Sequence, residues 1–205
     1  MDVMQEIATL RAAAQERTWN ILQPTLTSLL GAMGVFPALE IAVNTVNSYL
    51  PTFERYHPAD SEKGRILREL VVSVVSFGYA PDRLPEHLTG DYDTPGSGQF
   101  ANAVLELCRA MQGQREPAEK FDLLASAIAN TILAELAELW YSQNPEAYQR
   151  VRANHVDPET GEYSDPEAAR IPLAFWIDPE VAARDTAAWL RVADAIEAKF
   201  KPGAE

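Results

Sequence analysis

The chain has 205 residues, 47% of them hydrophobic, and its 30 acidic and 17 basic side chains give a formal net charge of -13 at pH 7. This length is sufficient for one domain with its own hydrophobic core, without disulfides or a metal. The acidic balance argues against a broad nucleic-acid surface, which needs clustered Lys and Arg, and against anionic membranes. It favours a soluble protein with a solvated acidic surface or a basic partner.

The single cysteine and the N-terminal sequence indicate the compartment. Cys108 lies in the apolar run AVLELCRAM, where we expect it to pack as a small core residue. The start of the chain, MDVMQEIATL, lacks the basic beginning and the long apolar centre of a signal peptide. No run reaches the roughly eighteen apolar residues of a membrane span. We therefore expect a cytoplasmic protein that does not enter a membrane.

Prolines divide the first part of the chain into expected helices. Asp2 suits the N-cap of a first helix that reaches about Gln23, where Pro24 interrupts the pattern. A short second helix follows from Pro24, because proline is suited to a first-turn position. A third helix opens at Pro37 in the same manner, and Pro51 ends or kinks it.

The segment from about Ser61 to Phe77 has the apolar period of a helix. Its run LVVSVVSF is rich in β-branched residues, which leaves a strand open, but the charged lead-in EKGRILREL favours the helix. Gly78 is placed to end it. Residues 79–98 contain three prolines and three glycines and fit neither period. Because long loops in compact domains are often functional, this stretch is a candidate site.

Two further helices are expected after this loop. The first runs from about residue 99 to 112, with Ser97 as its cap. The second covers residues 118–142, AEKFDLLASAIANTILAELAELWYS, and is apolar on more than one side. Such a helix needs neighbours on more than one side, so we place it at the centre of the fold. One of its apolar faces consists of Phe121, Ala125, Ile128, Ile132, Leu136 and Leu139.

The chain beyond residue 142 divides into three parts. Asn144 and Pro145 read as the cap and first position of a short helix that completes a helical core over residues 1–154. Residues 155–177 combine an acidic loop with an apolar anchor made by Leu173, Phe175, Trp176 and Ile177. Asp178 caps a last helix within residues 178–205, which packs on the same core or on a partner.

The acidic loops invite a metal-binding interpretation. Asp91, Asp93 and Gly96 match the start of a calcium loop, D-x-D-x-x-G. Calcium needs six to eight oxygen ligands, whereas Pro95 and Asn102 occupy the fifth and twelfth positions of the loop. The histidines, His57, His87 and His155, are far apart and lack zinc-site spacing. We therefore predict neither a metal nor a cofactor.

One short pattern points to catalysis. Arg150 and His155 stand as R-x-x-x-x-H, which resembles the motif of the HEPN ribonucleases, an all-helical family that usually works as dimers without metal. The match covers six residues. The resemblance implies that His155 helps to move the proton of the 2'-hydroxyl while Arg150 stabilises the phosphate charge. Neither a nucleophile motif such as G-x-S-x-G nor a phosphate loop accompanies it.

The sequence thus predicts an all-α single-domain bundle of about seven or eight helices around residues 118–142, with two long irregular loops. We expect a non-catalytic adaptor or complex subunit that binds a protein partner or a second copy of itself. Leu173, Phe175, Trp176 and Ile177 are the expected interface. The alternative is a HEPN-like ribonuclease using Arg150 and His155. A third hypothesis, ligand binding between helices, requires a cavity.

Overall fold

The computed structural model describes residues 2–58, 61–89, 92–113, 115–156 and 160–201. Within these ranges the chain forms nine α-helices, two short 3-10 helices and no β-strand, which confirms the all-α prediction. The α-helices are α1 (Val3–Glu16), α2 (Trp19–Met33), α3 (Val35–Tyr56), α4 (Glu62–Phe77), α5 (Ser97–Met111), α6 (Pro117–Gln143), α7 (Pro145–Ala153), α8 (Ile171–Ile177) and α9 (Pro179–Phe200). The 3-10 helices are η1 (Glu86–Thr89) and η2 (Ala168–Arg170).

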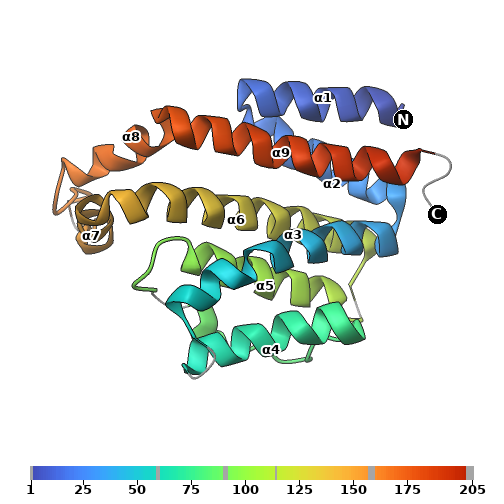
Figure 1. Cartoon of the computed structure of the whole chain (residues 1–205), viewed down its shortest axis with the longest axis horizontal. Helices are drawn as coiled ribbons and strands as arrows, with labels where there is room; N and C mark the ends of the chain where they lie inside the picture. The colour runs from blue at the N-terminus through green and yellow to red at the C-terminus, as the bar shows by residue number, and fades with distance from the viewer. Residues whose placement is uncertain (1, 59–60, 90–91, 114, 157–159, 202–205) are drawn as a thin grey trace.

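Helix α6 runs through the middle of the bundle (Figure 1). Helix α5 packs along it most extensively, and α3, α2 and α9 cover much of the remainder. Ile128 and Leu136 are fully buried and Ile132 is only 3% exposed. The prediction of a central buried helix is therefore confirmed, and the helix extends one residue beyond the predicted range at each end.

The length and composition of α6 alone would allow it to cross a membrane. However, 56% of its most apolar window is buried inside the bundle. Helices α2, α3, α5 and α9 already contact it, so its apolar surface is matched by protein. The core helix of a globular domain has these same properties, because it must be apolar on several sides.

Several helix ends lie where the sequence places them. The Asp2 carboxylate accepts hydrogen bonds from two backbone N–H groups of the first turn of α1, and Asp178 does the same for α9. The Ser61 hydroxyl accepts from the backbone N–H of Gly64 at the start of α4. Gly78 ends α4 in the left-handed conformation. The segment LVVSVVSF is thus helical, because capping and the charged lead-in outweigh its β-branched composition.

The predicted break at Pro24 is wrong, and Pro51 does not end the third helix. Helix α2 passes through Pro24 and α3 passes through Pro51. Each proline removes one hydrogen bond to the carbonyl four residues earlier, which belongs to Asn20 or Asn47. Both asparagines are exposed, so water can satisfy those carbonyls and the helices continue. The actual break between α1 and α2 lies at Arg17, whose φ of 56° is left-handed.

The start of α5 requires a glycine. The structure places Gly96, not Ser97, at the cap position, and Ser97 is the first helical residue. Gly96 has a φ of 77°. A Cβ atom at this position would lie 2.4 Å from the carbonyl oxygen of Ala134 and 2.6 Å from the hydroxyl of Tyr49. The predicted cap is thus displaced by one residue because only glycine fits this close approach to α6.

The central helix generates a stability prediction. Ile132→Ala should lower the free energy of unfolding by about 2 to 5 kcal/mol, because it removes buried methyl groups and leaves a cavity. Urea unfolding followed by circular dichroism measures this difference. The matched control is Ile21→Ala, since Ile21 is 40% exposed and should lose much less. Equal losses in the two variants would contradict the central position of α6.

Candidate functional site

A long groove lies between α3 and α9, with α6 as its floor. The two wall helices run antiparallel, since Glu40 near the start of α3 bonds Lys199 near the end of α9. Both walls pack on α6 but contact each other only over a short stretch. Figure 1 shows α9 and α3 on either side of α6. The groove therefore exists because both walls are held by the floor rather than by each other.

The larger part of the groove is mostly uncharged and has a volume of about 390 Å³. Small side chains face it from both walls, which keeps it open. Its uncharged lining residues are Ile41, Asn44, Thr45, Ser48, Thr131, Ile132, Ala188, Val192, Ala195 and Ala198. A second hollow of about 380 Å³ continues it and shares Ser48, Glu135 and Arg191. Together the two hollows form one continuous groove.

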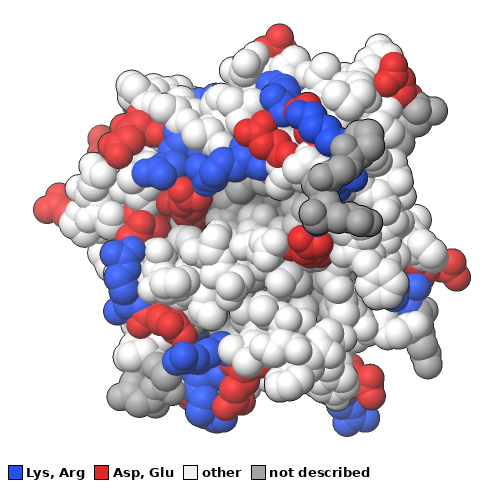
Figure 2. Space-filling view, turned by 45° about the vertical axis from the view of Figure 1, so that its right-hand side comes forward, with Lys and Arg blue, Asp and Glu red and all other residues white. Residues whose placement is uncertain are grey.

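Charged side chains border the larger hollow at both ends. At one end Lys199 Nζ lies 2.7 Å from Glu40 Oε1. At the other end Glu135 faces two arginines of α9, with Arg191 at 3.2 Å and Arg184 at 3.4 Å. Figure 2 shows a hollowed face with blue and red side chains along its rim and mainly uncharged surface inside. A mostly uncharged trough with a charged rim is compatible with a protein-binding surface.

A buried ion pair lies where the end of α1 meets α8 and α9. Arg17 Nε donates to Asp185 Oδ2 at 3.1 Å, and Asp185 is fully buried. Arg17 also donates to the carbonyl of Trp176 and lies 5.7 Å from the centre of its ring. Burial raises the pKa of the Asp185 carboxyl above its ordinary value, while Arg17 and the nearby indoles of Trp189 and Trp19 oppose the shift. One side chain thus joins α1, α8 and α9.

The predicted apolar anchor is divided by the structure. Phe175 is 6% exposed and lies against Trp140 and Tyr141 of α6. Trp176 is half-buried against Trp19. Leu173 and Ile177, by contrast, are 65% and 69% exposed. The four residues lie in the short helix α8, which puts Phe175 and Trp176 inward and the other two outward, rather than in the single apolar surface that was expected.

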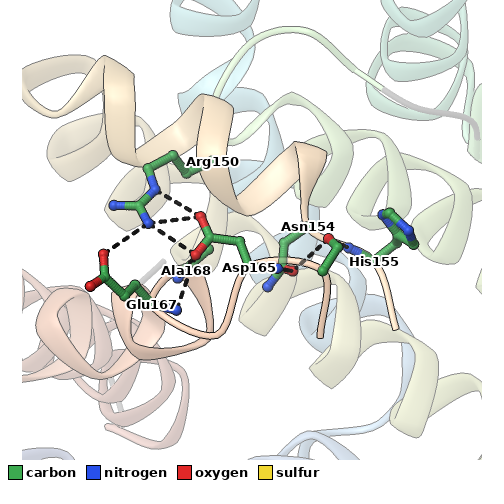
Figure 3. Close-up of polar contacts among 7 residues, drawn as sticks. Arg150, Asn154, His155, Asp165, Glu167 and Ala168 are labelled. Atoms are coloured by element: carbon green, nitrogen blue, oxygen red, sulfur yellow. Dashed lines mark hydrogen bonds and ion pairs between the residues drawn. The ribbon is translucent and has the colours of Figure 1, made fainter. Parts of the chain in front are cut away.

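Arg150 lies in α7 and His155 just beyond the end of that helix, and their side chains do not form one site (Figure 3). The Arg150 guanidinium binds both carboxylate oxygens of Asp165, at 2.7 to 3.0 Å, and Glu167 at 3.3 Å. Figure 3 shows this guanidinium directed toward the two acids, whereas the His155 ring points away from it. Hydrogen bonds from Arg150 lower the pKa of Asp165. Arg150 therefore anchors the acidic loop to α7, a role that the sequence did not indicate.

The residues considered as metal ligands do not come together in a metal site within the described residues. Asp91 lies outside the described residues. Asp93 is exposed and forms an ion pair with Arg152 at 2.7 Å. Within the described ranges, no group of three His, Cys, Asp or Glu side chains is placed to hold a metal ion. Cys108 is buried, and burial raises the pKa of its thiol to about 12, so the reactive thiolate is disfavoured at neutral pH.

A polar cluster that sequence reasoning missed joins α3 to α5. His57 Nε2 lies 2.7 Å from the Thr94 hydroxyl and 3.1 Å from the Ser97 hydroxyl. Burial and the charge of Lys63 lower the pKa of His57. Ser97 is only 1% exposed, so a substrate cannot reach its hydroxyl. The cluster therefore has a structural role, because it links the end of α3 to the start of α5. Its Ser and His are nevertheless residue types that can act as a nucleophile and its base.

The groove residues also escaped sequence reasoning. They come from three helices far apart in the chain and form no motif. The available signal was the spacing of Arg184, Ala188, Arg191 and Ala195, which places two arginines and two alanines on one face of the last helix. Comparison with protein-family models, with curated proteins and with solved structures finds no match.

The buried Asp185 generates a prediction about pH. Its pKa is raised in the folded state, so the folded protein holds this proton more tightly than the unfolded chain does. As the pH rises from about 3.8, the free energy of unfolding of the parent should therefore fall relative to that of Asp185→Asn. The fall should end once the pH exceeds the pKa of Asp185 in the folded protein. Urea unfolding of both proteins at a series of pH values measures the difference.

Asp165→Asn is the matched control for this series. Arg150 lowers the pKa of Asp165, so the sign is reversed. The parent should lose stability relative to Asp165→Asn as pH falls below about 3.8. The same pH trend in both variants would contradict the assignment of the raised pKa to Asp185.

Proposed function

We propose that this chain is a non-catalytic helical adaptor that binds an amphipathic helix of a partner protein in the α3–α6–α9 groove. The observation that carries the proposal is the open groove itself, whose larger hollow is mostly uncharged and has an ion pair at each end. The lining residues of α9 run from 184 to 199, which corresponds to about 22 Å at 1.5 Å per residue. This length suits about fifteen residues of helix.

The backbone of the walls favours a helix as the occupant. Both walls and the floor of the groove are α-helices, whose backbone N–H and C=O groups are already paired along the helix. An extended peptide would find no sheet edge there for its own backbone groups, and each buried unpaired group is costly. A helix satisfies these groups internally. It needs only to insert apolar side chains at helical spacing between α3 and α9.

A groove-filling substitution tests the proposal. Random peptides of about fifteen residues, displayed on phage, are selected on the parent protein and then synthesised. Ala195 is exposed and lines the groove, so Ala195→Trp fills the groove without disturbing the core. We expect it to weaken peptide binding at least about tenfold in isothermal calorimetry.

Ala183→Trp is the control for this experiment, because Ala183 is an exposed alanine of the same helix that does not line the groove. It should bind the peptides as the parent does. Equal affinity for the parent and Ala195→Trp, or a selection that yields no binder, would contradict the proposal. Circular dichroism melts establish that both tryptophan variants are folded.

The ribonuclease alternative has its own test. We expect purified protein to leave single-stranded RNA intact in the absence of divalent metal, because Arg150 is occupied by Asp165 and Glu167. Gel electrophoresis of labelled RNA after incubation measures this. Cleavage that disappears in His155→Ala, with an unchanged circular dichroism spectrum, would replace the adaptor proposal with a catalytic one.

A further inference from the structure

The outer face of α4 exposes apolar side chains. Helix α4 lies at the edge of the bundle opposite α1, and its main contacts are with α3 and α5 (Figure 1). Val72 and Val75 are 41% and 43% exposed, and Phe77 and Tyr79 at the end of the helix are 77% and 58% exposed. Single exposed apolar residues are ordinary on a protein surface. Four large ones between positions 72 and 79 indicate a contact surface.

The spacing along this face is that of a helix–helix seam. Arg65, Arg68, Val72 and Val75 follow one another at intervals of three, four and three residues, and all four are exposed. Side chains at these intervals form one stripe along a helix. A second helix can pack along such a stripe, with its own side chains inserted between those of the first. The stripe is basic towards the start of α4 and apolar towards its end.

The surface around this stripe is neutral. Its bases are Lys63, Arg65 and Arg68, and its acids are Glu62 and Glu69 of α4 together with Glu54 of α3, which pairs with Arg68. The formal charge of -13 therefore lies on other parts of the chain. Two copies of so acidic a protein repel each other over much of their surfaces. This repulsion is smaller where both copies present a neutral face with exposed apolar residues.

The stripe is complementary to itself when two copies of α4 lie antiparallel. A two-fold axis between Val72 and Val75 places Val72 of one copy against Val75 of the other. The same axis brings Arg68 of each copy to the end of α4 in the other, where Tyr79 is exposed. Aromatic rings and the partial negative charge of a helix C-terminus both attract an arginine. A parallel pair would instead place Arg65 and Arg68 against the same two arginines.

We propose that the outer face of α4 binds the same face of a second copy of this chain, as an antiparallel helix pair about an axis between Val72 and Val75. Helix α4 does not line the groove, so the proposal goes beyond the adaptor function and does not depend on it. The 16 residues of α4 are about 24 Å long. One helix pair of this length is smaller than a standard interface of roughly 800 Å² per partner, so the dimer should dissociate on dilution.

Sedimentation velocity of the full chain over a concentration series tests the proposal. The parent should shift from monomer towards dimer as its concentration rises through the micromolar range. Val75→Lys should remain monomeric over the same range, because it places an unpaired charge in the contact. Val72→Lys should act in the same way. Both valines are exposed in the monomer, so circular dichroism melts should match the parent, and either folded variant is sufficient for the test.

Leu173→Lys is the matched control. Leu173 is 65% exposed on α8, so its replacement introduces the same charge on a different apolar surface. This variant should form the dimer as the parent does. A parent that stays monomeric throughout the series would overturn the proposal. A dimer that survives both valine substitutions, or that Leu173→Lys alone abolishes, would overturn it as well.

Cross-linking tests the orientation of the pair. Cys108 is buried, so a cysteine introduced on the outer face of α4 is the accessible thiol. A short bismaleimide should join two copies of the Val72→Cys variant, because position 72 lies beside the axis. It should not join two copies of Arg65→Cys, since antiparallel pairing separates the two positions by about 25 Å along the helices. The reverse result would overturn the antiparallel assignment.

Discussion

The fold depends on the need to cover α6 on several sides. At 27 residues this helix is about 40 Å long, and much of its surface is apolar. No single neighbour can bury such a surface, so α2, α3, α5 and α9 are arranged around it. Helices α2, α3 and α5 each pack more extensively on α6 than on one another, whereas α9 packs on α6 and more extensively on α1. A gap between two adjacent neighbours is therefore tolerated, and the groove between α3 and α9 is such a gap.

The helices and most of their ends were predictable because their signals are local. Asp2, Ser61 and Asp178 cap the helices that follow them, and the period of residues 118–142 identified the central helix. The break at Pro24 and the alternative that Pro51 ends its helix were wrong, because the cost of a proline depends on whether water reaches the freed carbonyl. That is a property of the tertiary structure.

The groove could not be predicted from the sequence, for a related reason. Its residues are alanines, hydroxyl residues and a few charges, none of which is unusual on a helix surface. Their significance comes from the antiparallel placement of α3 and α9 over α6. The ion pairs of the acidic loop were not predictable either, because Arg150 of α7 supplies the counter-charge to Asp165 and Glu167 only once the chain has folded.

Aromatic rings cluster around α8. This clustering determines what intrinsic fluorescence measures when the protein unfolds in solution. Trp19 lies 5.5 Å from both Trp176 and Trp189, and Trp140 lies 5.8 Å from Phe175. All four tryptophans of the chain are therefore at or beside the docking site of α8. Intrinsic fluorescence reports the attachment of this seven-residue helix more directly than it reports the core around Ile132. An emission change that precedes the loss of helical ellipticity is the signature of local detachment, and should not be read as global unfolding.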